Sequence, residues 1–349
     1  MITVAQSNIH RILLIFLLGS FAMAQETEGI HRTIAFYNLE NLFDTIDDVP
    51  TFDEDYTRTG RNQYSGADYR SKMTLLASVI AEIGSEQRSA GPHLVGVAEI
   101  ENARVLEDLV AQPELEALSY AVIHEDSPDR RGIDVALLYR VDYFFPLSYE
   151  AVEVRLHDET GNRIYTRDVL WVHGILDGEE LHLLVNHWPS RRGGASRSSP
   201  KRMQAARVNQ EIIKKIRRSD PIPKILIMGD FNDDPTDKSL TEGLSSRAYS
   251  ELSPDDFFNP MLEMYNRGWN TMVYRDQIHL FDQILLSYSF VHPVAKDDFR
   301  LYRANIFKPE KLLVKEGKYR GYPFRSFQNG KFSGGYSDHF PVYVELVKP

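Results

Sequence analysis

The stretch "ILIMGDFNDDP", residues 225 to 235, joins an apolar run directly to acidic and amide side chains. The apolar residues and the glycine from Ile225 to Gly229 predict a buried β-strand. Asp230 and Asn232 follow two positions apart, a spacing that directs both side chains to one face of an extended chain. A surface turn explains residues 233–235, but it does not explain an acid placed immediately after a buried strand. The stretch therefore predicts a strand that delivers Asp230 and Asn232 to a functional site.

Other segments share this strand character, with apolar and β-branched residues between turn-forming residues. The predicted strands are Thr33–Leu39, Leu94–Glu99, Tyr120–His124, Asp134–Tyr139, Val169–Leu176, Leu181–Trp188, Ile225–Gly229, Leu280–Leu286 and Pro341–Leu346. Apolar residues at helical spacing predict helices over residues 70–83 and from about Lys201 to Arg217, and a shorter helix after Glu101. Many strands with few helices between them favour an α+β sandwich over a doubly wound parallel sheet. No linker divides the chain, so we predict one domain from about residue 30 to 347.

Polar side chains recur at the ends of these predicted strands. "NLEN" places Asn38 and Glu40 two positions apart, and "LVGVAEIEN" ends an apolar strand with Glu99. His187 continues the inward-facing row of its strand, and Asp282 carries a charge into the otherwise apolar "FDQILLS". Each feature alone is also compatible with a routine strand end or a satisfied core residue. Together they supply carboxylate and amide oxygens, the hard ligands suited to Mg²⁺ or Mn²⁺.

Composition and the N-terminus restrict the function classes. The formal charge of −10 argues against a protein that coats nucleic acid through its overall field, although a local basic groove is compatible with it. The absence of cysteine excludes disulfides, thiolate metal sites and cysteine nucleophiles. Residues 1–24 combine a basic start, an apolar run and a small-residue "AMA" end, which predicts a cleaved signal peptide and a secreted or periplasmic protein. The alternative for this segment is an uncleaved N-terminal anchor.

Two long polar segments, 45–67 and 189–200, are predicted to be loops. The second is strongly basic, and Arg191, Arg192 and Arg202 follow closely on His187. These arginines either lie on a solvated, flexible loop or bind the flanking phosphates of a substrate. Asp134 is an acid inside a predicted strand, and a pairing with Arg131 or Arg191 is one explanation for it.

The order of these motifs resembles that of the endonuclease/exonuclease/phosphatase superfamily, which includes enzymes similar to deoxyribonuclease I. The motifs that carry the resemblance are "NLEN", "AEIEN", "NHWPS", "GDFND", "FDQILLS" and "SDHFP", and they span essentially the whole chain after residue 24. The resemblance implies a four-layered α/β sandwich, with two packed mixed β-sheets flanked by helices, over residues 25–349. It also implies a site at the strand ends.

Matching the motifs residue by residue gives each candidate a role. The positions that match the metal ligands of the superfamily are Asn38, Glu40, Glu99 and Asp338. The positions that match its catalytic residues are His187, Asp230, Asn232, Asp282 and His339. The resemblance implies Mg²⁺ as the cofactor, with Mn²⁺ or Ca²⁺ as alternatives. Arg191, Arg192 and Arg202 are predicted to bind substrate on their proximity to His187 alone.

These observations lead to one functional hypothesis and two rivals. The first is a secreted, metal-dependent phosphodiesterase that hydrolyses nucleic acid, an endonuclease acting on DNA. The second is a phosphatase or lipid phosphodiesterase of the same superfamily, which the acidic charge of the chain favours. The third is a binding module with a degenerate site. We expect no stable membrane insertion and, although the sequence does not determine the oligomeric state, a monomer.

Overall fold

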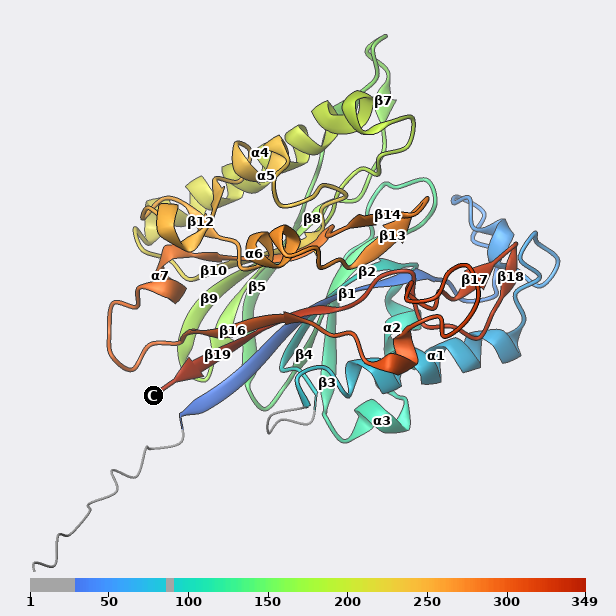
Figure 1. The fold of residues 1–349 in the computed structure, drawn as a ribbon, viewed down its shortest axis with the longest axis horizontal. Helices are drawn as coiled ribbons and strands as arrows, with labels where there is room; N and C mark the ends of the chain where they lie inside the picture. Colours follow the sequence, from blue (N-terminus) through green and yellow to red (C-terminus); the bar gives the residue numbers. More distant parts are fainter. Residues whose placement is uncertain (1–28, 86–90) are drawn as a thin grey trace, which may run out of the picture.

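The computed structural model describes residues 29–85 and 91–349 of the chain. Two mixed β-sheets pack face to face, with helices on both outer sides (Figure 1). The first sheet has the order β16 (Arg300–Ile306), β19 (Val342–Lys348), β1 (Ile30–Leu42), β2 (Leu94–Ile100), β4 (Asp134–Arg140) and β3 (Tyr120–His124). The second has the order β11 (Ser246–Arg247), β12 (Phe257–Phe258), β15 (Asp282–Ser287), β10 (Ile225–Asp230), β9 (Glu179–His187), β8 (Val169–Leu176) and β5 (Phe144–Val152).

Helices form the two outer layers, and three small hairpins project from the sheets. Helices α1 (Gly66–Ile80), α2 (Ala103–Val110) and α3 (Pro113–Glu116) lie beside the first sheet, and α4 (Ala195–Ser219) and α5 (Lys238–Thr241) beside the second (Figure 1). The short helices α6 (Met261–Asn266) and α7 (Tyr288–Val291) lie in connections of the second sheet. The hairpins are β6 (Leu156–His157) with β7 (Arg163–Ile164), β13 (Met272–Tyr274) with β14 (Gln277–His279), and β17 (Phe327–Gln328) with β18 (Lys331–Phe332).

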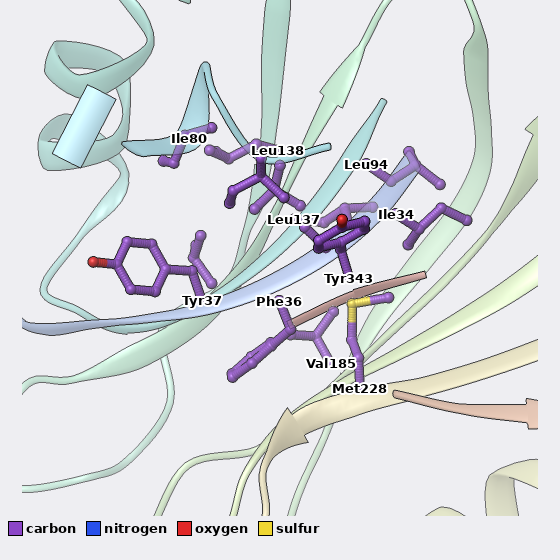
Figure 2. Close-up of a cluster of buried hydrophobic side chains, with 14 of the residues drawn as sticks. Ile34, Phe36, Tyr37, Ile80, Leu94, Leu137, Leu138, Val185, Met228 and Tyr343 are labelled. Carbon is purple, nitrogen blue, oxygen red and sulfur yellow. The ribbon is translucent and has the colours of Figure 1, made fainter. Parts of the chain in front are cut away.

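Strand β10 shows how the alternation of side chains builds two cores. Leu226 and Met228 belong to the cluster that also contains the side chains of β1 and β2. Ile225 and Ile227 point the other way and join the cluster formed with α4. Each such buried side chain stabilises the fold by roughly 1.5–3 kcal/mol. Figure 2 shows Phe36 of the first sheet beside Met228 of the second, at the centre of the first core.

The strand directions bring one end of each sheet to the same place. Strands β1 and β2 are parallel, and so are β9 and β10. Strands β19 and β15 run antiparallel to β1 and β10, respectively. The starts of β19 and β15 therefore lie beside the carboxyl ends of the parallel strands. This arrangement gathers residues from six distant segments of the chain at one end of the sandwich.

The predicted fold class is confirmed, and all nine predicted strands are present. Strands β5 and β16 were not predicted. Their residues are mostly exposed or half-buried, and apolar and polar side chains do not alternate regularly along them. Helix α4 begins at Ala195 and not near Lys201, so the prediction of a loop over 189–200 is wrong for its second half. Ser198 Oγ donates a hydrogen bond to the carbonyl oxygen of Gly194, the residue that precedes the helix.

The predicted signal peptide, residues 1–24, lies outside the described residues. Within residues 29–85 and 91–349, none of the helices combines the length and the hydrophobicity needed to cross a bilayer.

Candidate active site

Two matching turns at the ends of β1 and β10 form the centre of the site. Asn38 Oδ1 accepts a hydrogen bond of 2.9 Å from the backbone N–H of Glu40, and Asp230 Oδ1 accepts one of 2.9 Å from that of Asn232. The two turns face each other, because Asn38 Nδ2 donates to Asp230 Oδ2 over 3.1 Å. Asn38 is fully buried and both atoms of its amide are bound. Its contacts favour a role in orienting Glu40 and Asp230 over the predicted role of metal ligand.

Several site residues have a left-handed backbone conformation. The φ angles are 47° at Glu40, 54° at Asn41, 60° at Glu99 and 50° at Asn232. Residues other than glycine rarely adopt this region, and when they do they cluster at functional sites. The i, i+2 spacing predicted a shared strand face, but turns and not strand alternation direct Glu40 and Asn232. The strand pattern located the end of β10 to within one residue, placed the end of β1 three residues early, at Leu39, and missed this local geometry.

His339 lies between two buried carboxylates. Its Nδ1 is 2.7 Å from Asp282 Oδ2, and its Nε2 is 3.9 Å from both Asp230 Oδ2 and Asp338 Oδ1. Burial lowers the pKa of His339, but the charges of Asp282 and Asp230 outweigh it and raise the pKa well above its usual value. The neighbouring carboxylates therefore favour the protonated form of His339, and Asp282 fixes the orientation of its ring.

Asp230 lies at the centre of the site, close to Asn38, His187 and His339. Burial raises its pKa to about 7, although the positive charge of His339 acts in the opposite direction. Gly229, the preceding residue, is needed for close strand contact, because a Cβ there would lie 2.3 Å from the carbonyl oxygen of Asn186. Asp230 and Asp282 are also direct partners in the antiparallel register of β10 and β15. Sheet pairing thus fixes the two carboxylates that act on His339.

His187 completes this group from the end of β9. Its Nε2 lies 3.6 Å from Asp230 Oδ2 and 3.8 Å from Glu99 Oε1. Burial lowers the pKa of His187 well below its usual value, and the charges of Arg167 and Arg131 lower it further. His187 is therefore a neutral imidazole beside the charged His339. A neutral imidazole has one N–H group, through which it donates one hydrogen bond.

A second group of carboxylates adjoins these residues. Arg325 Nε lies 3.2 Å from Glu40 Oε1, and Arg325 Nη2 lies 3.0 Å from Asp338 Oδ2. The fully buried Lys72 donates a hydrogen bond to the carbonyl oxygen of Glu40. Burial, together with the charge of Asp338, raises the pKa of Glu40 to about 7. Arg325 and Lys72 therefore offset part, but not all, of the negative charge collected here.

The second group offers the oxygen ligands that hard divalent cations take, although the ligand atoms of Glu40, Glu99 and Asp338 do not all lie within 4.8 Å of one another. Glu99 Oε2 accepts a 3.0 Å hydrogen bond from the backbone N–H of Asn41, which leaves Glu99 Oε1 beside His187. Asp338 is part-exposed and Glu40 is buried. Oxygen ligands from one to three carboxylates are what Mg²⁺ and Ca²⁺ take in proteins. Asp230, Asp282 and His339 also lie close enough to hold a metal, but the 2.7 Å contact of His339 with Asp282 is typical of an imidazole oriented by a carboxylate.

The predicted substrate arginines differ in where they lie. Arg202 is 1% exposed, and its Nε lies 2.7 Å from Asp233 Oδ2. The prediction that Arg202 contacts substrate is therefore wrong, because protein atoms enclose its guanidinium. Arg191 is partly exposed, but its Nη2 lies within 3.2 Å of carboxylate oxygens of Asp233 and Asp234. Arg192 is exposed and remains available.

We expect the substitution Arg202→Ala to lower the free energy of unfolding by about 1.5–3 kcal/mol, because it removes the closest cationic partner of the buried Asp233, which keeps its contacts with Arg191 and Ser239. Arg192→Ala should change it by no more than about 0.5 kcal/mol, as is usual for an exposed side chain. Denaturant unfolding of both variants measures the difference. Equal stability of the two variants would contradict the structural role of Arg202.

Sequence reasoning missed or misread other charged residues around the site. Arg325 contacts Glu40 from 285 positions away in the chain, a distance that no local pattern reveals. Arg167 donates a 2.6 Å hydrogen bond to the carbonyl oxygen of Trp188 and so supports the segment after His187. Asp134 pairs with neither Arg131 nor Arg191. Its Oδ2 lies 3.1 Å from Nε2 of His124, the residue that directly ends the neighbouring strand β3.

The match to a family model assigns the chain to a class of protein, the metal-dependent phosphoric ester hydrolases. The chain belongs to the endonuclease/exonuclease/phosphatase family, whose model matches residues 33–348. This confirms the resemblance found in the sequence. No curated protein matches the chain.

Solved structures share the fold at low sequence identity. TDP2 from D. rerio, complexed with a single-strand DNA product, has a TM-score of 0.55 and 14% identity, covering 90% of this chain and 98% of that one. A family protein from Bacteroides thetaiotaomicron has a TM-score of 0.51 and 19% identity, covering 92% and 99%. One from Bacteroides vulgatus has a TM-score of 0.54 and 15% identity, covering 92% and 100%.

Proposed function

We propose that the chain is an exported, Mg²⁺-dependent phosphodiesterase that hydrolyses DNA as an endonuclease. The observation that carries the phosphodiesterase assignment is the position of His339 between Asp282 and Asp230, next to the carboxylates of Glu40 and Glu99. In-line attack of water on a phosphodiester needs a base, hydrogen-bond donors and positive charge, but no covalent nucleophile. This site supplies all three kinds of group.

Each residue has a defined part in this reaction. Asp230 accepts a proton from the attacking water as the new P–O bond forms and the bond to the leaving oxygen breaks. The imidazolium of His339 and the N–H of His187 stabilise the negative charge that builds up on the phosphoryl and leaving oxygens. Glu40, Glu99 and Asp338 would hold the divalent metal, which supplies further positive charge at a phosphoryl oxygen.

The ionisation of Asp230 predicts a pH dependence. The pKa of Asp230 is raised to about 7, and only its ionised form accepts a proton, so activity increases as pH rises through this value. Below pH 7 we expect kcat/KM to fall by roughly tenfold per pH unit. The measurement is kcat/KM for DNA cleavage from pH 5.5 to 8.5 at constant free Mg²⁺. A flat profile between pH 6 and 8 would rule out Asp230 as the base.

Two observations support DNA as the substrate. Arg192 is exposed close to His187 in the sequence, and Arg131 is 46% exposed and acts on the pKa of His187. The D. rerio TDP2 structure, which shares the fold, contains a DNA product. The rival substrate class is a small or membrane-borne phosphate ester, which the net charge of −10 and the acidic partners of Arg191 favour.

A substrate panel separates these classes. Purified protein is incubated with plasmid DNA, RNA, sphingomyelin and inositol phosphates, each with Mg²⁺ and with chelator. We expect plasmid nicking that disappears with chelator. Release of inorganic phosphate or phosphocholine without DNA cleavage would instead support the rival, and bound metal with no turnover would indicate a binding module.

A further inference from the structure

Another cluster of carboxylates, distinct from the group of Glu40, Glu99 and Asp338, lies apart from the residues assigned to catalysis. It is formed by Asp44, Asp48 and Asp53, on the segment between β1 and α1, and by Glu101, which follows β2. Single oxygens of Asp48, Asp53 and Glu101 all lie within 4.8 Å of one another. The backbone N–H of Asp44 donates a 2.6 Å hydrogen bond to Glu101 Oε2, which places Asp44 beside the rest of the cluster. The cluster thus connects a long loop to the start of α2.

Burial makes this cluster unlike an ordinary acidic surface. Asp53 is 1% exposed, Glu101 6% and Asp44 8%. Asp53 Oδ2 accepts a 2.9 Å hydrogen bond from the backbone N–H of Asp48, but the buried Oδ1 of Asp53 has no hydrogen-bond partner. An unpartnered buried carboxylate oxygen is costly, so native proteins pair such a group, protonate it or bind it to a cation.

The part of the chain that the structure describes supplies no ion-pair partner for this cluster. Across the described segments 29–85 and 91–349, no Lys, Arg or His nitrogen lies within ion-pair distance of these four carboxylates. Backbone N–H groups orient the side chains of Asp44, Asp53 and Glu101 but carry no net charge. Burial and the side-chain contact with Asp53 raise the pKa of Glu101 to about 8, so a proton shared by these two carboxylates is the alternative to a bound cation. A divalent cation neutralises two charges, and the free oxygen of Asp53 binds it as a ligand.

We propose that Asp44, Asp48, Asp53 and Glu101 bind a structural calcium ion that holds the β1–α1 segment against the start of α2. Calcium takes six to eight oxygen ligands in flexible geometry, whereas Mg²⁺ usually uses one or two carboxylates and retains several waters. The exposed side chain of Asp48 leaves the cluster open to solvent on one side, which gives the ion an entry path. This site is independent of the proposed function.

The loop that the ion would hold also borders the active site. Phe43, next to Asp44, stacks on Tyr56 with ring centroids 4.3 Å apart, and Tyr56 contacts Phe327 of the β17–β18 hairpin. That hairpin follows Arg325, which contacts Glu40. Figure 1 shows the β17–β18 hairpin and the β1–α1 segment at the same end of the molecule. Calcium at the cluster would therefore stabilise one wall of the site without contacting the substrate.

Calcium titration of the metal-stripped full chain tests this proposal by calorimetry and by thermal denaturation. The variants are Asp53→Asn in the cluster, Asp55→Asn as an exposed control on the same loop, and Asp338→Asn in the active site. We expect wild type, Asp55→Asn and Asp338→Asn to bind calcium and to melt several degrees higher with it. Asp53→Asn should raise the dissociation constant at least about tenfold.

Three results would overturn the proposal: the two that follow, and the absence of calcium binding by wild type. One is unchanged calcium affinity in Asp53→Asn, and the other is loss of all calcium binding in Asp338→Asn, which would place the ion in the active site. If wild type binds no calcium, the carboxylates share a proton instead, and Asp53→Asn should then melt at or above the wild-type temperature. If Asp53→Asn does not fold, Asp48→Asn replaces it, because Asp48 is exposed and the same loss of affinity is expected.

Discussion

The substitution His339→Ala is expected to reduce kcat for phosphodiester hydrolysis by about 10²–10⁴-fold while the protein stays folded. His339 is the one imidazole of the site whose pKa is raised, because Asp282 and Asp230 flank it. Its removal takes a fixed positive charge from the position where the transition state becomes most negative. KM should change little, since the charge acts mainly on the transition state.

Single-turnover kinetics measure this effect, with circular dichroism as the check on folding. His157→Ala is the matched control, because His157 is exposed on the β6–β7 hairpin, and it should retain wild-type activity. His339→Gln keeps a polar side chain next to Asp282 but carries no charge, and it should be nearly as slow as the alanine variant. Near wild-type turnover in both His339 variants would remove His339 from the mechanism.

The second large effect is expected on removal of the metal. Dialysis against a chelator should lower activity by roughly 10³-fold or more, since a bound metal contributes several kcal/mol of transition-state stabilisation. Added Mg²⁺ should restore it. Glu40→Gln should raise the Mg²⁺ concentration needed for half-maximal activity at least about tenfold, because it replaces a charged ligand by a neutral one.

Glu107→Gln is the control for this experiment, because Glu107 is exposed on α2 and belongs to none of the motifs. It should show the wild-type Mg²⁺ requirement. Activity that persists after exhaustive chelation would contradict the metal-dependent mechanism. A Glu40→Gln variant with an unchanged Mg²⁺ requirement would instead place the metal on other residues.

The position of the site was predictable because each motif stands at the end of a strand. The apolar run before Asp230 indicated a buried strand, and the polar residues after it could only lie at its end. The same reasoning located Glu99 and His187. What the sequence could not show is the mutual arrangement of these ends, such as the 3.1 Å contact of Asn38 with Asp230 across two sheets.

The errors have specific physical causes. Arg202 was predicted to bind substrate only because it is close to His187 in the sequence, but helix α4 turns Arg202 toward the buried Asp233. Asp134 was considered as a partner for an arginine, but its carboxylate instead lies beside His124 of the adjacent strand. Both outcomes depend on packing between elements, which no local pattern encodes.

The central claim is that Asp230 activates water for metal-dependent cleavage of DNA. The most direct test compares wild type and Asp230→Asn on a plasmid, with saturating Mg²⁺ and with chelator, by following the rate at which the supercoiled form is nicked. The account predicts rapid nicking only for wild type with Mg²⁺, and a rate at least about 100-fold lower for Asp230→Asn. Equal nicking by the two proteins, or no nicking by wild type, would contradict it.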